Sequence, residues 1–105
     1  SMAIVQRRVF YGKVGAADRL VEWANEMYGL IAAKEPGLKQ RILTDHQSGR
    51  TDRMAVEIEA DSLAALDAMF DKVMADLGSD PAFQASFAKL SDLIDHAEVE
   101  QWRIH

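Results

Sequence analysis

The order in which the hydrophobic spacing changes along the chain constrains its fold more than any other feature. Alternating β-branched and aromatic residues predict a strand over 4–14, and a helical repeat follows over 17–34. Two more strands are predicted over 38–45 and 53–59, then two helices, and a last strand over 98–104. The predicted order is therefore strand, helix, strand, strand, helix, helix, strand.

The ends of the first helix and of the central hairpin are marked by residues with local structural preferences. Leu20, Trp23 and Met27 recur at helical spacing, and Pro36 stops this helix because proline cannot continue its backbone bonding. The polar segment 46–52 contains a glycine and joins the second and third strands. We therefore expect these two strands to be hairpin neighbours.

Two further helices are predicted between the third and fourth strands. The first is expected to begin at a cap from Asp61 or Ser62 and to end at Gly78. The second is shorter and starts with Asp80 and Pro81. Its apolar residues at helical spacing are Phe83, Phe87, Leu90 and Ile94.

This order of elements is a split βαβ arrangement with one extra helix before the last strand, an α+β fold. Its four-stranded antiparallel sheet is expected to be covered by the two main helices on one face. The other face is expected to carry Val5 or Val9, with Ile42 and Val99, beside charged groups. A second copy of the chain would bury that face, and a closed two-fold pair is the commonest assembly. We therefore expect a homodimer.

Composition limits the possible classes of function. The length of 105 residues suits one domain, which we place over 3–105, with Ser1 interpreted as a remnant of expression. A formal charge of −5 without a Lys/Arg cluster argues against nucleic acid as a partner. No apolar run is long enough to cross a bilayer, and no signal peptide is recognisable, so no membrane partner is expected. The absence of cysteine excludes thiolate chemistry and fits a cytoplasmic location.

Motifs for metals, cofactors and common catalytic groups are missing from the sequence. His46, His96 and His105 lack the short spacing of metal ligands on a helix, so neither a metal nor a cofactor is expected. His46 beside Asp45 fits a solvated hairpin better than an acid/base pair. The absence of a serine nucleophile elbow, a phosphate-binding loop and a dinucleotide fingerprint argues against hydrolases, kinases and nicotinamide enzymes.

Three stretches carry a resemblance to a known superfamily. They are Lys13-Val14-Gly15, the turn Glu35-Pro36-Gly37, and Asp80-Pro81-Ala82-Phe83-Gln84 followed by Phe87-Ala88-Lys89-Leu90. Together they resemble the dimeric α+β barrels, a ferredoxin-like superfamily with NIPSNAP-like, EthD-like and antibiotic-biosynthesis-monooxygenase-like members. The last stretch is most similar to the NIPSNAP-like proteins. The resemblance implies the fold and a two-copy barrel, but the superfamily spans monooxygenases, isomerases, decyclising enzymes and haem-dependent enzymes, so it selects no activity.

The resemblance also suggests where a catalytic site would lie. Barrels of this kind hold ligands between sheet and helices or inside the barrel, and their cofactor-free monooxygenases use asparagine and tryptophan near the first helix. Trp23 fits core packing better, because it lies on the apolar stripe of its helix. Phenol, amide and guanidinium groups could fix a polar ligand in that space. The candidate catalytic residues are Tyr11, Asn25, Tyr28 and Arg103.

A second set of polar residues follows the alternation of the strands and is a candidate ligand-binding group: Arg7, Arg41, Glu57 and Gln101. The sequence does not fix which residues of each strand point inward. If these four converge, arginines facing Glu57 would suit a small carboxylate or phenolate. The pattern favours the alternative, an ion-pair network between two sheets.

Two functions from different classes are compatible with these residues and with the resemblance. One is a homodimer that binds a small molecule, with activity as a cofactor-independent monooxygenase or isomerase on an aromatic or polyketide-like compound. The other is a noncatalytic structural or partner-binding dimer whose barrel is filled by side chains. A closed cavity lined by a tyrosine and an arginine would favour the first.

Overall fold

The computed structural model describes residues 3–46 and 48–105. The interpretation of Ser1 and the position of Gln47 in the hairpin lie outside the described residues. The elements, in chain order, are β1 (Ile4–Gly12), α1 (Ala17–Lys34), β2 (Lys39–Thr44), β3 (Arg53–Ala60), α2 (Leu63–Leu77), α3 (Pro81–Lys89), the 3₁₀ turn η1 (Leu90–Asp92) and β4 (Ile94–Arg103). This is the predicted order, and the α+β fold is confirmed.

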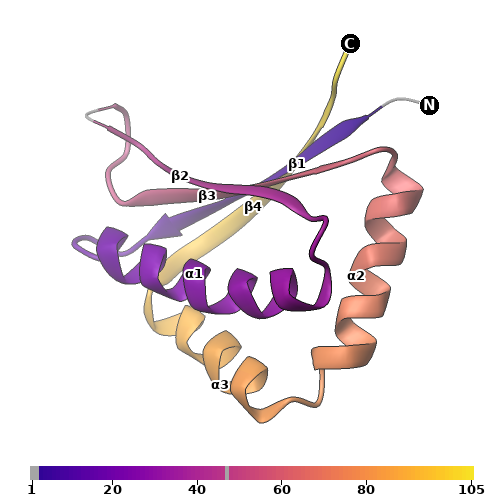
Figure 1. Cartoon of the computed structure of the whole chain (residues 1–105). Coiled ribbons are helices and arrows are strands. Elements are labelled where there is room, and N and C mark those ends of the chain that lie inside the picture. The colour runs from indigo at the N-terminus through magenta and orange to yellow at the C-terminus, as the bar shows by residue number, and fades with distance from the viewer. Residues whose placement is uncertain (1–2, 47) are drawn as a thin grey trace.

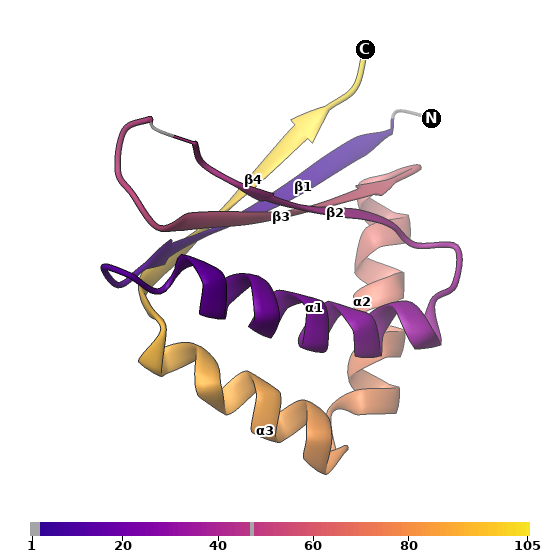
Figure 2. The same ribbon diagram turned by 60° about the vertical axis from the view of Figure 1, so that its left-hand side comes forward.

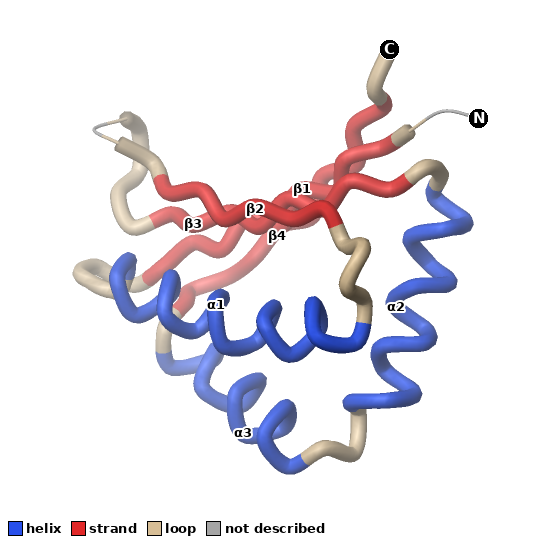
Figure 3. Tube along the Cα trace, in the orientation of Figure 1, coloured by secondary structure: helices blue, strands red, loops and turns tan. Residues whose placement is uncertain are grey.

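The four strands form one antiparallel sheet in the order β2-β3-β1-β4, as the split βαβ arrangement requires. All three helices lie on the same side of the sheet (Figures 1 and 3). We call this side the inner face; from β1 it carries Arg8 and Phe10. The opposite side is the outer face; from β1 it carries Arg7 and Tyr11. The turned view in Figure 2 shows the outer face pointing away from every helix.

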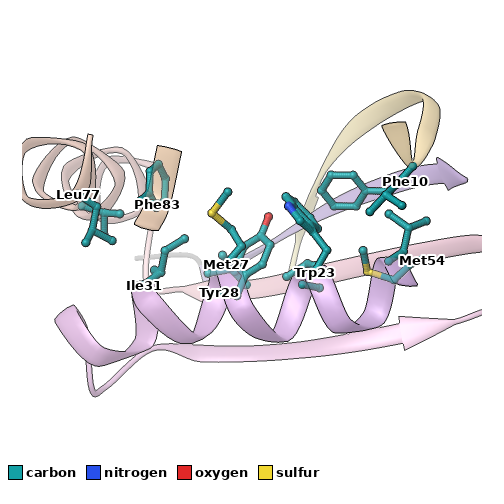
Figure 4. Packing of buried hydrophobic residues seen from close by; sticks show 14 of the residues in the cluster. Phe10, Trp23, Met27, Tyr28, Ile31, Met54, Leu77 and Phe83 are labelled. Carbon is teal, nitrogen blue, oxygen red and sulfur yellow. The ribbon is translucent and has the colours of Figure 1, made fainter. Parts of the chain in front are cut away.

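The core lies between the inner face and α1. Phe10, Leu20 and Met54 are at most 2% exposed. The Trp23 ring meets the Phe10 ring edge-on at 5.2 Å (Figure 4). Its indole nitrogen donates a 2.7 Å hydrogen bond to the Ser86 carbonyl oxygen of α3. Trp23 is therefore a packing residue that joins α1, the sheet and α3, as the apolar stripe of the helix predicts.

The helix starts are capped, and the cap of α1 comes from far along the chain. The Ala17 N–H donates to the Asp52 carboxylate at 3.2 Å, and the Gly12 N–H donates to the Asp52 carbonyl at 3.0 Å. Asp52 makes both bonds from the left-handed region, at a φ of 64°. A backbone hydrogen bond from Gly15, followed by that from Ala17, lowers the pKa of the Asp52 carboxyl. The hairpin is thus tied to the start of α1.

The two later helices have local caps. The Ser62 hydroxyl accepts a 3.0 Å bond from the Ala65 N–H, and the Asp80 carboxylate accepts a 2.8 Å bond from the Ala82 N–H. Of the two candidates for the α2 cap, Ser62 is the one used. No helix in the described part of the chain is long and apolar enough to span a membrane.

Three predicted boundaries are wrong by more than one residue: the end of the third helix, the start of the last strand and the end of the first strand. The third helix ends at Lys89, and Ile94 is the first residue of β4, where it pairs with Gly12. The first strand stops at Gly12, where the pairing with β4 shifts register, so Val14 lies in the following turn and is 95% exposed.

The predicted apolar content of the outer face is also partly wrong. Ile42 pairs with Val56, a core residue, and packs against the core from the inner face. Val99 pairs with Arg8 and also lies on the inner face. The apolar residues that the outer face carries are Val5, Val9, Leu43, Ala55 and Trp102.

Candidate functional site

A cavity of about 290 Å³ lies between the inner face and the helices. The sheet contributes residues of β1 and β4, and α1, α2, α3 and η1 supply the rest of the lining. The apolar lining residues are Phe10, Trp23, Met27, Ile31, Phe70, Val73, Met74, Phe83, Phe87, Leu90 and Ala97. Figure 4 shows several of them in a row along α1, with the Tyr28 oxygen at the end of its ring among them. Such a lining suits an aromatic or aliphatic ligand.

Two polar side chains complete this lining, Arg8 from β1 and Tyr28 from α1. Tyr28 is 7% exposed, and burial raises the pKa of its phenol, while the Arg8 charge lowers it in part. The phenol is therefore a hydrogen-bond donor at neutral pH. A guanidinium and a neutral phenol in the same cavity lining are a charged and a neutral hydrogen-bond donor for an acidic ligand.

Two large apolar residues of the cavity lining are also exposed to solvent. Met74 of α2 and Phe87 of α3 line it and are nevertheless 54% and 60% exposed. Large apolar side chains that are half exposed at a cavity mouth are available to contact an entering apolar ligand. The cavity therefore has an apolar entrance.

The outer face carries a different arrangement, centred on Glu57 of β3. Its carboxylate accepts hydrogen bonds from Arg41 of β2 at 2.6 Å and from Arg7 of β1 at 2.7 Å. Glu57 is only 4% exposed because these two arginines cover it. Burial alone would raise the pKa of Glu57, but hydrogen bonds and charges from Arg41 and Arg7 lower it overall. Arg7 also lies 3.5 Å from the Glu100 carboxylate of β4.

A second group on the outer face lies near the hairpin. The rings of Tyr11 and His96 stack at 4.3 Å, and the Arg50 guanidinium lies 5.2 Å from the centre of the Tyr11 ring. Partial burial, then the Glu98 carboxylate, raises the pKa of the Tyr11 phenol. His46 lies in the exposed hairpin, away from any strand. Among the described residues, no three His, Asp or Glu side chains are grouped as metal ligands would be.

The structure does not bring the four candidate catalytic residues together. Tyr28 lines the inner cavity, whereas Asn25 is exposed on α1 and is not among the lining residues. Tyr11 lies on the outer face. Arg103 pairs with Ile4 at the far end of β4, also outside the cavity lining.

Three of the four candidate ligand-binding residues are brought together, and the fourth is not. Arg7, Arg41 and Glu57 share the outer face and are hydrogen-bonded within one sheet, whereas the network between two sheets stays a prediction. Gln101 pairs with Gln6 and lies on the inner face. Trp102 takes the outer face, where its indole nitrogen donates to Glu100 at 2.8 Å. The expectation that Val99 lies on the outer face implied the reverse orientation of this strand and is wrong.

Arg8 is a cavity residue that the motifs and spacings of the sequence did not single out, although a signal was present. In an alternating strand it lies on the same side as Phe10, a residue of the core. A charged residue on the buried side of a strand is unusual unless it is paired or serves a site. That position, two residues before a core phenylalanine, is the clue.

Comparison of the structure with solved proteins reveals the same fold in several of them. An uncharacterised NIPSNAP-domain protein from Burkholderia xenovorans is 17% identical, with a TM-score of 0.76 over 97% of this chain and 94% of that chain. A dimeric ferredoxin-like protein of unknown function from Thermobifida fusca is 17% identical, with a TM-score of 0.64 over 99% and 92%. A proposed antibiotic biosynthesis monooxygenase from Chloroflexus aurantiacus is 20% identical, with a TM-score of 0.62 over 100% and 94%.

These likenesses define the class of fold. The chain has the ferredoxin-like α+β fold that NIPSNAP-domain and monooxygenase-like proteins share, as the sequence resemblance implies. No protein-family profile matches the sequence, and no curated protein is significantly similar to it. At these identities the likeness establishes the fold, so an activity must be argued from the site.

Proposed function

We propose that this chain works as a homodimer that binds a small, largely apolar molecule bearing an acidic group, such as an aromatic or polyketide-like carboxylic acid or phenol. The observation that carries the proposal is the inner cavity, where Arg8 and Tyr28 are the polar groups of an otherwise apolar lining. An apolar body would fill the cavity, and the acidic group would accept hydrogen bonds from the guanidinium and the phenol.

The same cavity could also support catalysis, as a cofactor-independent monooxygenase or isomerase. Such reactions on phenols or ketones pass through a phenolate or enolate, and a nearby cation stabilises the charge that develops. Arg8 would supply that cation, and Tyr28 would donate a hydrogen bond to the same oxygen. We retain Tyr28 from the candidate catalytic set and leave out Tyr11, Asn25 and Arg103, because they do not line its cavity.

The homodimer is supported by the outer face, which no helix covers in one copy of the chain (Figure 2). It carries Val9, Leu43 and Trp102 beside the charged groups, and Trp102 is 55% exposed. A second copy would remove these apolar groups from water. We also place the protein in the cytoplasm, on the ground that it has no cysteine.

The alternative is a noncatalytic structural dimer. The Glu57 network favours it, because salt-bridged side chains occupy the middle of the outer face. The two functions differ in what they require of the inner cavity. A ligand-binding protein needs Arg8 there, and a purely structural dimer does not.

Isothermal titration calorimetry with 1-hydroxy-2-naphthoate tests the proposal. The intact protein should bind this probe, and Arg8→Gln should weaken binding by about tenfold or more, since hydrogen bonds to charged groups contribute about 1.5–3 kcal/mol. Arg19→Gln is the matched control, because Arg19 is an exposed arginine of α1 outside the cavity lining. A neutral analogue, 2-naphthalenemethanol, should bind the intact protein and the Arg8→Gln variant with similar affinity, because it carries no acidic group for the guanidinium to pair with.

Three results would contradict the proposal. The first is an absence of binding by either probe, and the second is equal naphthoate affinity in the intact protein and in Arg8→Gln. The third is loss of binding in Arg41→Gln alone, which would move the site to the outer face. Oxygen uptake by bound hydroxynaphthoate, measured with an oxygen electrode, then separates a monooxygenase from a simple binding protein.

A further inference from the structure

A second apolar hollow adjoins the inner cavity. It is a groove of about 340 Å³ between the end of α2 and α3, and we call it the α2–α3 groove. The residues that line it are Met74, Gly78, Phe83, Gln84, Phe87 and Ala88. Three of them, Met74, Phe83 and Phe87, also line the inner cavity. The two hollows therefore meet at these three side chains.

The lining of the α2–α3 groove is uncharged. Gln84 is its polar side chain, and the Gln84 amide nitrogen donates a 3.1 Å hydrogen bond to the Gly78 carbonyl oxygen. This bond ties α3 to the end of α2 and uses a donor of the amide within the chain. Met74 and Phe87 present apolar surface to solvent at the same place. Such walls favour hydrocarbon over a charged group.

The polar groups of the cavity and the apolar groove lie in different parts of this combined space. Arg8 and Tyr28 line the cavity and not the groove. An acidic group that pairs with Arg8 therefore stays in the cavity, and an apolar extension that passes Met74 and Phe87 enters the groove. A stable protein partner would take about 20–30 residues from each side, whereas six line this groove. The size of the groove thus suits a hydrocarbon chain.

We propose that the acidic ligand of the inner cavity carries a flexible hydrocarbon tail, as alkyl-substituted aromatic acids and fatty acids do, and that this tail lies in the α2–α3 groove. This inference rests on the proposed function and adds the class of ligand and the place of its tail. A bound tail would cover exposed surface of Phe87 and Met74. The unbranched side chain of Met74 can adjust to the tail where it leaves the cavity.

Isothermal titration calorimetry with two matched acids tests whether a tail adds affinity. The probes are 4-butylbenzoate and 4-octylbenzoate, which share the acid and the ring and differ by four methylenes. Each methylene that leaves water tightens binding by up to about fourfold, so four half-buried methylenes should tighten it by about tenfold or more. Arg8→Gln should weaken both probes by a similar factor, because their acidic group is the same.

The variant Ala88→Glu tests where the tail lies. Ala88 is exposed on α3 and lines the groove but not the cavity. A carboxylate at this position should remove most of the advantage of 4-octylbenzoate and leave the affinity for 4-butylbenzoate unchanged. Ala85→Glu is the matched control, because Ala85 is an exposed residue of the same helix outside both linings. It should keep the full advantage of the longer probe.

The outcomes separate this inference from the proposed function. If neither probe binds, or if Arg8→Gln binds both as the intact protein does, the proposed function and this inference both fall. If 4-butylbenzoate binds through Arg8 but 4-octylbenzoate binds no more tightly, only the tail is overturned. An advantage of the longer probe that persists in Ala88→Glu also overturns the inference, because the tail would then lie elsewhere.

A second measurement applies if Ala88→Glu does not fold. The chain has no cysteine, so Ala88→Cys and Ala85→Cys each introduce a single thiol at an exposed site of α3. Saturating 4-octylbenzoate should slow the reaction of iodoacetamide with the thiol of Ala88→Cys, whereas 4-butylbenzoate should not. Neither probe should affect Ala85→Cys. An unchanged rate in Ala88→Cys with bound 4-octylbenzoate would overturn the placement of the tail.

Discussion

Two adjacent arginines of β1 lie in opposite surroundings. Arg8 points to the inner face and lines an apolar cavity with Tyr28, whereas Arg7 points to the outer face and pairs with Glu57 and Glu100. The outer arginine has its charge balanced within the chain, and the inner one has an apolar cavity beside it. The same residue type therefore serves an ion-pair network on one face and a candidate binding site on the other.

The difference follows from the alternation of a strand. Successive side chains point to opposite faces, so a single step along β1 moves from the side covered by helices to the side left open. On the inner face, side chains are held mainly by packing against α1. On the outer face, side chains are held mainly by the charges of neighbouring strands.

The largest expected effect is a loss of folding stability at Phe10 on the inner face, compared with its neighbour Tyr11 on the outer face. Phe10→Ala removes a ring that is 2% exposed and packed against Trp23, and should lower the free energy of unfolding by about 3–5 kcal/mol. Tyr11→Ala, on the outer face, should lower it by roughly half as much or less, because its ring is only partly buried. Urea unfolding at one protein concentration measures both, and equal losses would contradict the contrast.

The next effect concerns the Glu57 network. Glu57→Ala leaves Arg7 and Arg41 facing each other without their shared carboxylate and should lower the free energy of unfolding by about 1–3 kcal/mol. Glu59→Ala is the control, since its pair with Lys39 is exposed and should contribute at most about 0.5 kcal/mol. If both variants lose the same free energy of unfolding in urea, the Glu57 network contributes no more to stability than an exposed ion pair.

The pH dependence of stability provides a finer test of the same network. The pKa of Glu57 is lowered from 4.5 in the folded chain, so its ionised form is favoured by folding. Its contribution is fully present above pH 4.5 and is lost as the pH falls through the lowered folded pKa. Glu57→Gln should therefore flatten the decline of thermal stability below pH 4.5. An unchanged acid slope in this variant would show that other carboxyls determine it.

The smallest expected effect lies in α3. The Ser86 hydroxyl is buried and has no hydrogen-bond partner among the described residues, although the Ser86 carbonyl accepts the Trp23 bond. Ser86→Ala should leave the free energy of unfolding unchanged or raise it by up to about 1 kcal/mol, because it removes an unpaired polar group. Ser91→Ala, at an exposed position whose hydroxyl donates to the Ala88 carbonyl, should not raise it. A clear loss of stability in Ser86→Ala would indicate that the hydroxyl is bonded after all.

Sequence patterns predicted the helices best where their ends carry strong signals. The bounds of α1 agree with the prediction, because a glycine and a proline flank a regular apolar stripe. The end of α3 was misjudged because Ile94 continues the helical spacing of Leu90, while pairing with Gly12 places it in a strand. Local spacing cannot reveal a pairing with a strand that is distant in the sequence.

The candidate site was harder to predict than the fold. β4 is an edge strand that is exposed over most of its length, so its sequence has no clear buried side to fix its orientation. This is why the sequence did not fix which face of the sheet Gln101 and Arg103 occupy. The ion-paired set of Arg7, Arg41 and Glu57 was found because strand alternation places opposite charges on one face. Arg8 was recognised as a candidate site residue only when the structure showed that it lines the cavity.

Native mass spectrometry in the presence of 1-hydroxy-2-naphthoate tests most directly whether the two faces have separate roles. The intact protein should be a dimer carrying the probe, Arg8→Gln a dimer with little or no probe, and Arg41→Glu a monomer that still binds it. A probe that is lost with Arg41→Glu but retained in Arg8→Gln would place the binding site at the outer face and contradict the assignment of the inner cavity.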